Sequence, residues 1–163
     1  RVSRVSRNQM LPRIWAPSRR APIPETIRDD LRARLLRHTI RKWRQRIANI
    51  LVRFHGRHAY VAATKRKKGD QNPVTLDRYA PDRVVPVELC RLGYRGHKDE
   101  WEYAFYKYSD ERYEPSIMAS GHFTATPEQC FYTAAGGCIL AEGVGGRLRE
   151  KAGNDLRERS ASR

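Results

Sequence analysis

The sequence predicts one α+β domain with an N-terminal helix, an antiparallel sheet of about four to five strands and a C-terminal helix. The chain has 163 residues, a length that suits one domain. Apolar residues recur every three or four positions in two segments, one before and one after the middle of the chain, as in helices. In the middle of the chain apolar and polar residues alternate, as in strands. Because the strands follow one another between two helices, we expect both helices on one face of the sheet. We place this domain at residues 23–141.

The first helix is expected from about Pro24 to Ala48. Proline suits the first helical position because its missing N–H is not needed there. The only acidic residues of this region, Glu25, Asp29 and Asp30, lie in the first turns, where the helix dipole favours negative charge. Apolar residues then follow helical spacing in two series, Ile27, Leu31 and Leu35, and Leu36, Ile40, Trp43 and Ile47.

Five strands are expected in the middle of the chain. They are Ile50–Phe54, His58–Ala62, Val87–Tyr94, Trp101–Tyr108 and a strand from about Tyr113 to Ala119. The first two form a hairpin with Gly56 at the turn, and the next two form a second hairpin. Residues 65–86 contain three prolines and are expected to form a loop.

The second helix has the clearest local signal in the chain. Thr126 is placed to cap it, Pro127 to occupy its first position and Gln129 to complete a capping box. We expect this helix to reach about Leu140, with its buried face formed by Phe131, Ala134 and Ala135. Outside the domain, residues 1–22 are expected to form a disordered basic arm and residues 142–163 a charged flexible tail.

The positive charge is concentrated in the first part of the chain. Residues 1–66 contain 18 of the 33 Lys and Arg and 3 of the 18 Asp and Glu, so they account for the whole formal charge of +15. This asymmetry indicates a polyanionic partner, for which nucleic acid, an acidic protein surface and an anionic membrane surface are the alternatives.

Two sets of basic residues are candidates for contacting nucleic acid. Arg34, Arg37, Arg41 and Arg44 form a stripe along the expected first helix, and a basic run follows the first hairpin. That run consists of Lys65, Arg66, Lys67 and Lys68. A solvated helix face is the alternative interpretation of the stripe, since no nucleic-acid recognition motif accompanies it.

Tyrosines of the second hairpin are candidates for a second site. In the strand Trp101–Tyr108, alternation places Trp101, Tyr103 and Phe105 on one face, and Glu102, Ala104, Tyr106 and Tyr108 on the other. If their face of the sheet is open, the tyrosines can stack on bases. The alternative function is a small enzyme or ligand-binding domain with a pocket lined by Arg91, Tyr103, Tyr106 and Tyr108.

Several other classes of protein lack support in the sequence. No stretch has the roughly 20 apolar residues of a membrane span. Cys90, Cys130 and Cys138 are odd in number and widely spaced, which indicates reduced thiols in a cytoplasmic protein. Their spacing does not indicate a metal site, no glycine-rich phosphate loop opens a helix, and no cofactor is expected. We therefore expect a non-catalytic binding protein.

Short runs between Pro22 and Leu140 also form a pattern of their own. They are Pro24–Leu31, Cys90–Leu92, Trp101–Ser109, Ser120–Phe123 and Thr126–Glu128. In these runs the chain resembles a family of small bacterial proteins of unknown function, so the resemblance implies a bacterial protein but no activity or ligand. The chain departs from the pattern near Tyr132, where an acidic residue is usual, and near Ile139, where a tyrosine is usual.

Overall fold

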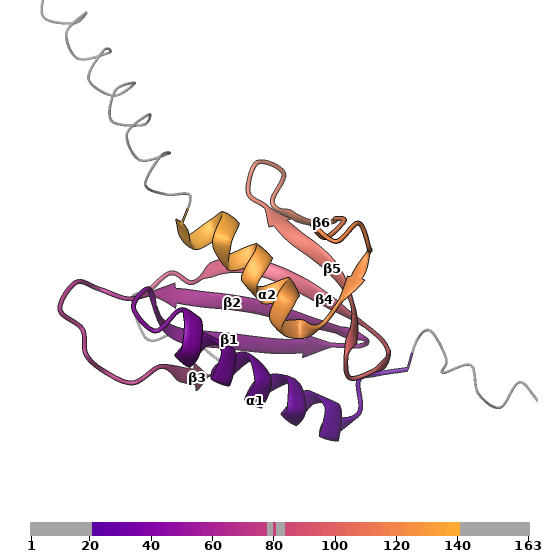
Figure 1. Cartoon of the computed structure of the whole chain (residues 1–163), viewed down its shortest axis with the longest axis horizontal. Helices are drawn as coiled ribbons and strands as arrows, with labels where there is room; N and C mark the ends of the chain where they lie inside the picture. Colours follow the sequence, from indigo (N-terminus) through magenta and orange to yellow (C-terminus); the bar gives the residue numbers. More distant parts are fainter. Residues whose placement is uncertain (1–20, 78–79, 81–83, 141–163) are drawn as a thin grey trace, which may run out of the picture.

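The computed structural model describes residues 21–77, 80 and 84–140, and within them it shows an α+β fold (Figure 1). Helix α1 (Glu25–Lys42) precedes the strands, and helix α2 (Pro127–Ala135) follows them and continues as a π-helical segment, Gly136–Leu140. The strands are β1 (Ile47–His55), β2 (His58–Lys65), β3 (Thr75–Asp77), β4 (Val87–His97), β5 (Glu100–Lys107), β6 (Arg112–Pro115) and β7 (Thr124–Ala125). The predicted order of helix, strands and helix is confirmed.

Both predicted hairpins are present, but the sheet differs from the prediction. The strand order is β3-β1-β2-β4-β5-β6, with β7 also paired to β5. Strand β3 runs parallel to β1, so the sheet is mixed and has more strands than expected. The expected loop 65–86 contains β3, which has only three residues. A strand of three residues between prolines is too short to show an alternation of apolar and polar residues. It forms because the edge of β1 is free to pair with it.

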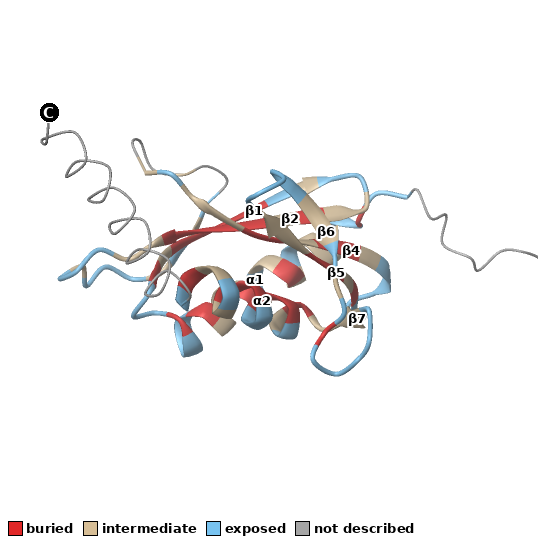
Figure 2. Cartoon of the chain, turned by 90° about the horizontal axis from the view of Figure 1, so that it is seen from above, coloured by how far each residue is buried: buried red, intermediate tan, exposed pale blue. Residues whose placement is uncertain are grey.

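The two helices lie on the same side of the sheet, as predicted (Figure 2). The core between the layers contains Leu31 and Leu35 of α1, and Phe131, Ala134 and Ala135 of α2. From the sheet it contains Ile50, Val52, Val61, Leu89, Leu92, Trp101 and Tyr103. The predicted buried face of α2 is confirmed, and the opposite face of the sheet, which we call the far face, has no helix of the described region on it.

Helix α1 ends six residues earlier than predicted. Its C-cap is Trp43, a turn follows, and Ile47 already begins β1. The amide of Ile47 donates to the carbonyl of Trp43 at 2.9 Å. These two residues are therefore joined by a hydrogen bond between positions four apart, as in a helix, although both lie beyond the end of α1. No glycine or proline marks the end. Pairing of β1 with β2 decides it, because β-branched residues fit a strand well. The second apolar series is therefore not a helix face, and Ile40 is 45% exposed.

The strand predicted from Tyr113 to Ala119 is also shorter. Strand β6 ends at Pro115, and the following loop returns to β5 through β7. Strands β6 and β7 thus share one edge of β5, because β6 pairs with its second half and β7 with Trp101 and Glu102. Pro115 cannot donate a ladder hydrogen bond, which suits the end of an edge strand.

The local signals at turns and caps are confirmed. Gly56, at the first loop position of the first hairpin, has a φ of +56°, and a type II′ turn requires glycine there. At α2, the Thr126 hydroxyl accepts from the amide of Gln129, and the Gln129 side chain accepts from the amide of Thr126 at 3.1 Å. This reciprocal capping box satisfies two amides that the helix itself leaves unpaired.

Candidate nucleic-acid interface

Intramolecular contacts divide the basic residues into two groups, and Arg34 shows the first kind most clearly. Its Nε and Nη2 donate to the two carboxylate oxygens of Glu128 at 2.7 and 2.8 Å. Its Nη1 lies 2.8 Å from Asp99 and donates to the carbonyl of Lys98. Arg34 therefore joins α1, the β4–β5 turn and α2, and its side chain is only 14% exposed.

The charges of this cluster stabilise one another. The hydrogen bond to Glu128 and the negative charges of Glu128 and Asp99 raise the pKa of Arg34, although burial opposes this. Burial is the largest single influence on the pKa of Glu128 and acts to raise it. The hydrogen bonds and charge of Arg34, together with hydrogen bonds from the Glu128 amide and Thr126, outweigh burial, so the pKa is lowered. Arg34 thus acts as a structural link between elements, although its position in the stripe predicted a role in binding.

Arg66 has a similar structural role at the end of β2. It donates to the carbonyls of Arg44, Ile47 and Asn72, at 2.6, 3.2 and 2.8 Å, and to the carboxylate of Asp70 at 3.0 Å. Its side chain is 8% exposed. Arg66 therefore holds the loop after β2 against the turn after α1.

The second group consists of seven exposed basic residues that lie close together. Within the described part of the chain they make no ion pair with a carboxylate. They lie in the second half of α1, in the turn after it and in the loop after β2. We call them the basic end: Arg37, Arg41, Lys42, Arg44, Arg46, Lys67 and Lys68.

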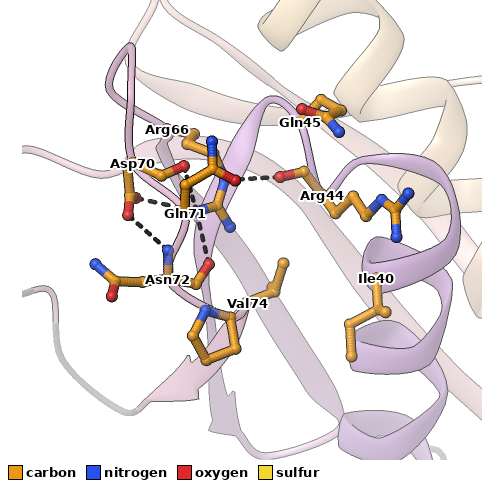
Figure 3. Close-up of a pocket in the computed structure, with 9 residues that line it drawn as sticks. Ile40, Arg44, Gln45, Arg66, Asp70, Gln71, Asn72 and Val74 are labelled. Atoms are coloured by element: carbon orange, nitrogen blue, oxygen red, sulfur yellow. Dashed lines mark hydrogen bonds and ion pairs between the residues drawn. The ribbon is translucent and has the colours of Figure 1, made fainter.

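Contacts between their backbones bring these segments together. The amide of Arg66 donates to the carbonyl of Arg46, so the residues that follow Arg66 lie beside the turn that follows α1. Arg44 and the loop after β2 also line one hollow of about 400 Å³ (Figure 3). Its other lining residues include Ile40, Gln45, Asn72 and Val74. A partly apolar hollow therefore lies beside Arg44 of the basic end.

The sequence explains why these cations lack partners. No Asp or Glu occurs from Leu31 through Gly69, and the next acidic residue, Asp70, is paired with Arg66. The helix dipole favours Arg41 and Lys42 in the last turn of α1. It does not account for the cations of the turn or of the loop. The absence of acidic residues from this stretch also marks Lys42 and Arg46 as cations without a partner. The predicted arginine stripe on the first helix did not include them.

Lys65, another predicted binding residue, is placed differently. It ends β2 and is half-buried, and burial lowers its pKa. The electrostatic effect of Cys138 acts in the opposite direction but is smaller. We leave it outside the basic end.

The predicted tyrosine pocket is divided by the sheet. Arg91, Tyr106 and Tyr108 lie on the far face, whereas Tyr103 belongs to the core beneath the helices. The strand alternation that separates Tyr103 from Tyr106 is confirmed, so the grouping of all four residues in one pocket is wrong. Burial raises the pKa of Tyr103.

Two tyrosines that the sequence analysis did not group with this site complete the far face. Tyr60 of β2 pairs in register with Arg91, and Tyr113 of β6 pairs with Tyr106. The Tyr113 hydroxyl donates to Glu88 at 2.7 Å, and burial raises its pKa, so it remains a donor. Alternation along β2 would have placed Tyr60 on this face, but Tyr113 depends on the pairing of β6.

The cysteines offer little reactivity. Cys90 and Cys130 are buried, and burial raises the pKa of both, that of Cys130 to about 12. Burial also raises the pKa of Cys138. Because the thiolate is the nucleophile, these environments disfavour thiol chemistry. The described residues contain no cluster of three or more His, Cys, Asp or Glu that could hold a metal ion, and no helix among them is long and apolar enough to cross a membrane.

Comparisons with protein-family models, curated proteins and solved structures found no match to this chain. The resemblance to a bacterial family therefore remains an expectation from the sequence.

Proposed function

We propose that this protein binds nucleic acid through the basic end. The observation that supports this proposal is that seven exposed cations gather at one end of the described region without a carboxylate partner. Arg28, Arg32, Arg34, Arg53, Arg66 and Arg95 each pair with an acidic residue of the same chain. Arg91 and Lys98 also make no ion pair within the described residues, but they lie apart from the basic end.

The arrangement suits a chain of phosphates. The cations extend from the exposed side of α1 across the turn to the loop after β2, so they form a surface and not a single point. Exposed Arg and Lys neutralise phosphates and release their counterions, which makes the affinity depend strongly on salt. No residue of this surface is placed by a known base-reading motif, so we expect little discrimination between sequences.

The test is a binding titration with a short fluorescein-labelled oligonucleotide at several salt concentrations. The variant replaces Arg41, Arg44 and Lys68 by Gln. Its matched control replaces Arg95, Lys98 and Arg112 by Gln, which removes the same charge from exposed residues elsewhere. Both variants retain residues 1–20, so their difference reports on the basic end alone.

We expect the basic-end variant to bind the oligonucleotide about tenfold or more weakly than the original protein. The slope of log affinity against log salt concentration should become less negative by about 2–3. The control variant should stay close to the original protein. Equal losses in the two variants would assign binding to overall charge, and no binding at low salt would overturn the proposal. Competition by polyglutamate as strong as that by the oligonucleotide would favour an acidic protein surface instead.

A further inference from the structure

We infer that the far face of the sheet stacks unpaired bases, so that the nucleic acid bound by this protein is single-stranded. This inference rests on the proposed function and names its substrate class. It is carried by four tyrosine rings and an arginine on a sheet face that no described helix covers.

The rings form a continuous row across the far face. Tyr60 contacts Tyr113, with ring centroids 5.2 Å apart, and Tyr113 contacts Tyr106 at 5.0 Å. Tyr106 in turn contacts Tyr108 at 4.8 Å. All three contacts are edge-to-face, so neighbouring rings do not stack flat on one another. Tyr108 is exposed, and Tyr60, Tyr106 and Tyr113 are partly exposed.

Hydrogen bonds to Glu88 hold two of these rings in place. Tyr113 donates to its carboxylate, and the Tyr108 hydroxyl both accepts from the Glu88 amide and donates to its carbonyl, at 2.8 and 3.3 Å. The other carboxylate oxygen of Glu88 accepts from Arg53 at 2.7 Å. With these hydroxyls occupied, the tyrosines offer a ligand their ring surfaces, which suits stacking by any base.

The face also carries positive charge beside the rings. In the sheet register, Arg53, Tyr60 and Arg91 are direct neighbours on three adjacent strands. The Arg91 guanidinium lies 5.9 Å from the centroid of the Tyr113 ring and makes no ion pair within the described residues. Arg53 is paired with Glu88, so Arg91 is the guanidinium group beside the rings that can meet a phosphate. A row of aromatic rings beside such a group complements a strand that carries both bases and phosphates.

A hollow beside the tyrosine row is large enough to hold a planar base. It measures about 420 Å³ and is lined by Arg53, Phe54, His55, Tyr60, Glu88, Tyr106 and Tyr113. This volume falls within the roughly 300–1,000 Å³ of pockets that hold small organic molecules. A duplex keeps its bases stacked on each other, so only an unpaired base can present its face to these rings.

The far face and the basic end are close enough for one strand to reach both. Strand β2 runs from the tyrosine row at Tyr60 to Lys65, and the basic end resumes at Lys67. Tyr60 and Lys67 are seven residues apart in the sequence, which is at most about 23 Å of extended chain. Strand-binding domains of similar size contact about 4–16 nucleotides, which is ample for this distance.

The experiment compares Tyr106→Leu with Tyr106→Phe. The Tyr106 hydroxyl makes no hydrogen bond within the described part of the chain, so phenylalanine keeps the ring and its packing, whereas leucine removes the aromatic surface. The probes are a labelled single strand and a duplex of the same sequence, each titrated at several salt concentrations. Far-ultraviolet circular dichroism establishes that both variants are folded.

We expect Tyr106→Leu to weaken single-strand binding about 5- to 150-fold, which corresponds to the loss of about 1–3 kcal/mol for one stacked base. Its salt dependence should stay unchanged, its duplex binding should not change, and Tyr106→Phe should bind like the original protein. Unchanged single-strand binding by Tyr106→Leu, or an equal loss on the duplex, would overturn the inference. So would displacement of the single strand by a free mononucleotide at comparable concentration, which would assign the site to nucleotides.

The two proposals fail separately. If the unaltered protein binds neither probe at low salt, the proposed function is wrong. If it binds both and only the basic-end variant binds weakly, the proposed function stands and the stacking inference is wrong.

Discussion

Arg34 and Arg37 lie three residues apart on the same helix, yet their side chains have opposite surroundings. Arg34 is held by Glu128, Asp99 and the carbonyl of Lys98, whereas Arg37 is exposed and makes no ion pair within the described residues. A bidentate pair between partly buried groups contributes to stability, and removing one partner leaves the other desolvated without compensation. An exposed arginine without a partner contributes little.

Replacing these two arginines by Ala should therefore give opposite results. We expect Arg34→Ala to lower the free energy of unfolding by about 2 kcal/mol, because it leaves Glu128 and Asp99 without their cation. Arg37→Ala should change stability by less than about 0.5 kcal/mol and should weaken oligonucleotide binding. Urea unfolding and the binding titration measure the two effects, and a stability loss of equal size in both variants would contradict this division.

At the level of elements, the two helices are stabilised by different interactions. Helix α1 has no side-chain cap at Pro24, and its contacts with the sheet and α2 hold it in place. Helix α2 has nine residues, and short helices are marginal by themselves. Its capping box and its buried face, with Phe131 fully buried, therefore matter more.

The cap of α2 gives a measurable expectation. Thr126→Ala removes the hydroxyl that accepts from the Gln129 amide, and it should destabilise the protein by about 1 kcal/mol. Thr126→Ser keeps an acceptor at the same position and should lose much less. Chemical denaturation of the three proteins provides the measurement, and equal midpoints for all of them would show that the box does not stabilise α2.

For the whole molecule, partly buried histidines link stability to pH. Burial lowers the pKa of His38 and of His58, and Arg41 and Lys42 add to the effect at His38. The Nε2 atom of His38 is buried without a hydrogen-bond partner, so a proton there would place a charge in a poor environment. The unfolded chain, with a histidine pKa near 6.5, therefore binds protons at a higher pH than the folded protein does.

Stability should consequently be fully present above about pH 6.5 and should fall as the pH is lowered through that value. Glu128, whose pKa is lowered below its usual range, contributes a separate loss only in more acidic solution. Thermal unfolding at pH 7.5 and 5.5 measures the histidine effect. The drop should be smaller in His38→Gln, and a drop of unchanged size would assign it to other groups.

The sequence by itself determined the features that depend on neighbouring residues. The start of α1, the two hairpins, the turn at Gly56 and the capped start of α2 follow from periodicity, turn chemistry and capping, which act over a few residues. The concentration of cations in the first part of the chain is likewise a property of composition. These features were predicted because the interactions that produce them are local.

Only the tertiary structure decided which of those residues remain available to a partner. Arg34 is occupied because Glu128, 94 positions away, lies beside it, and Tyr60 joins Tyr113 because the intervening strands bring them together. Strand β3 and the early end of α1 likewise depend on pairing with β1. Long-range pairing leaves no period in the sequence, since its energy comes from partners that approach only when the chain is folded.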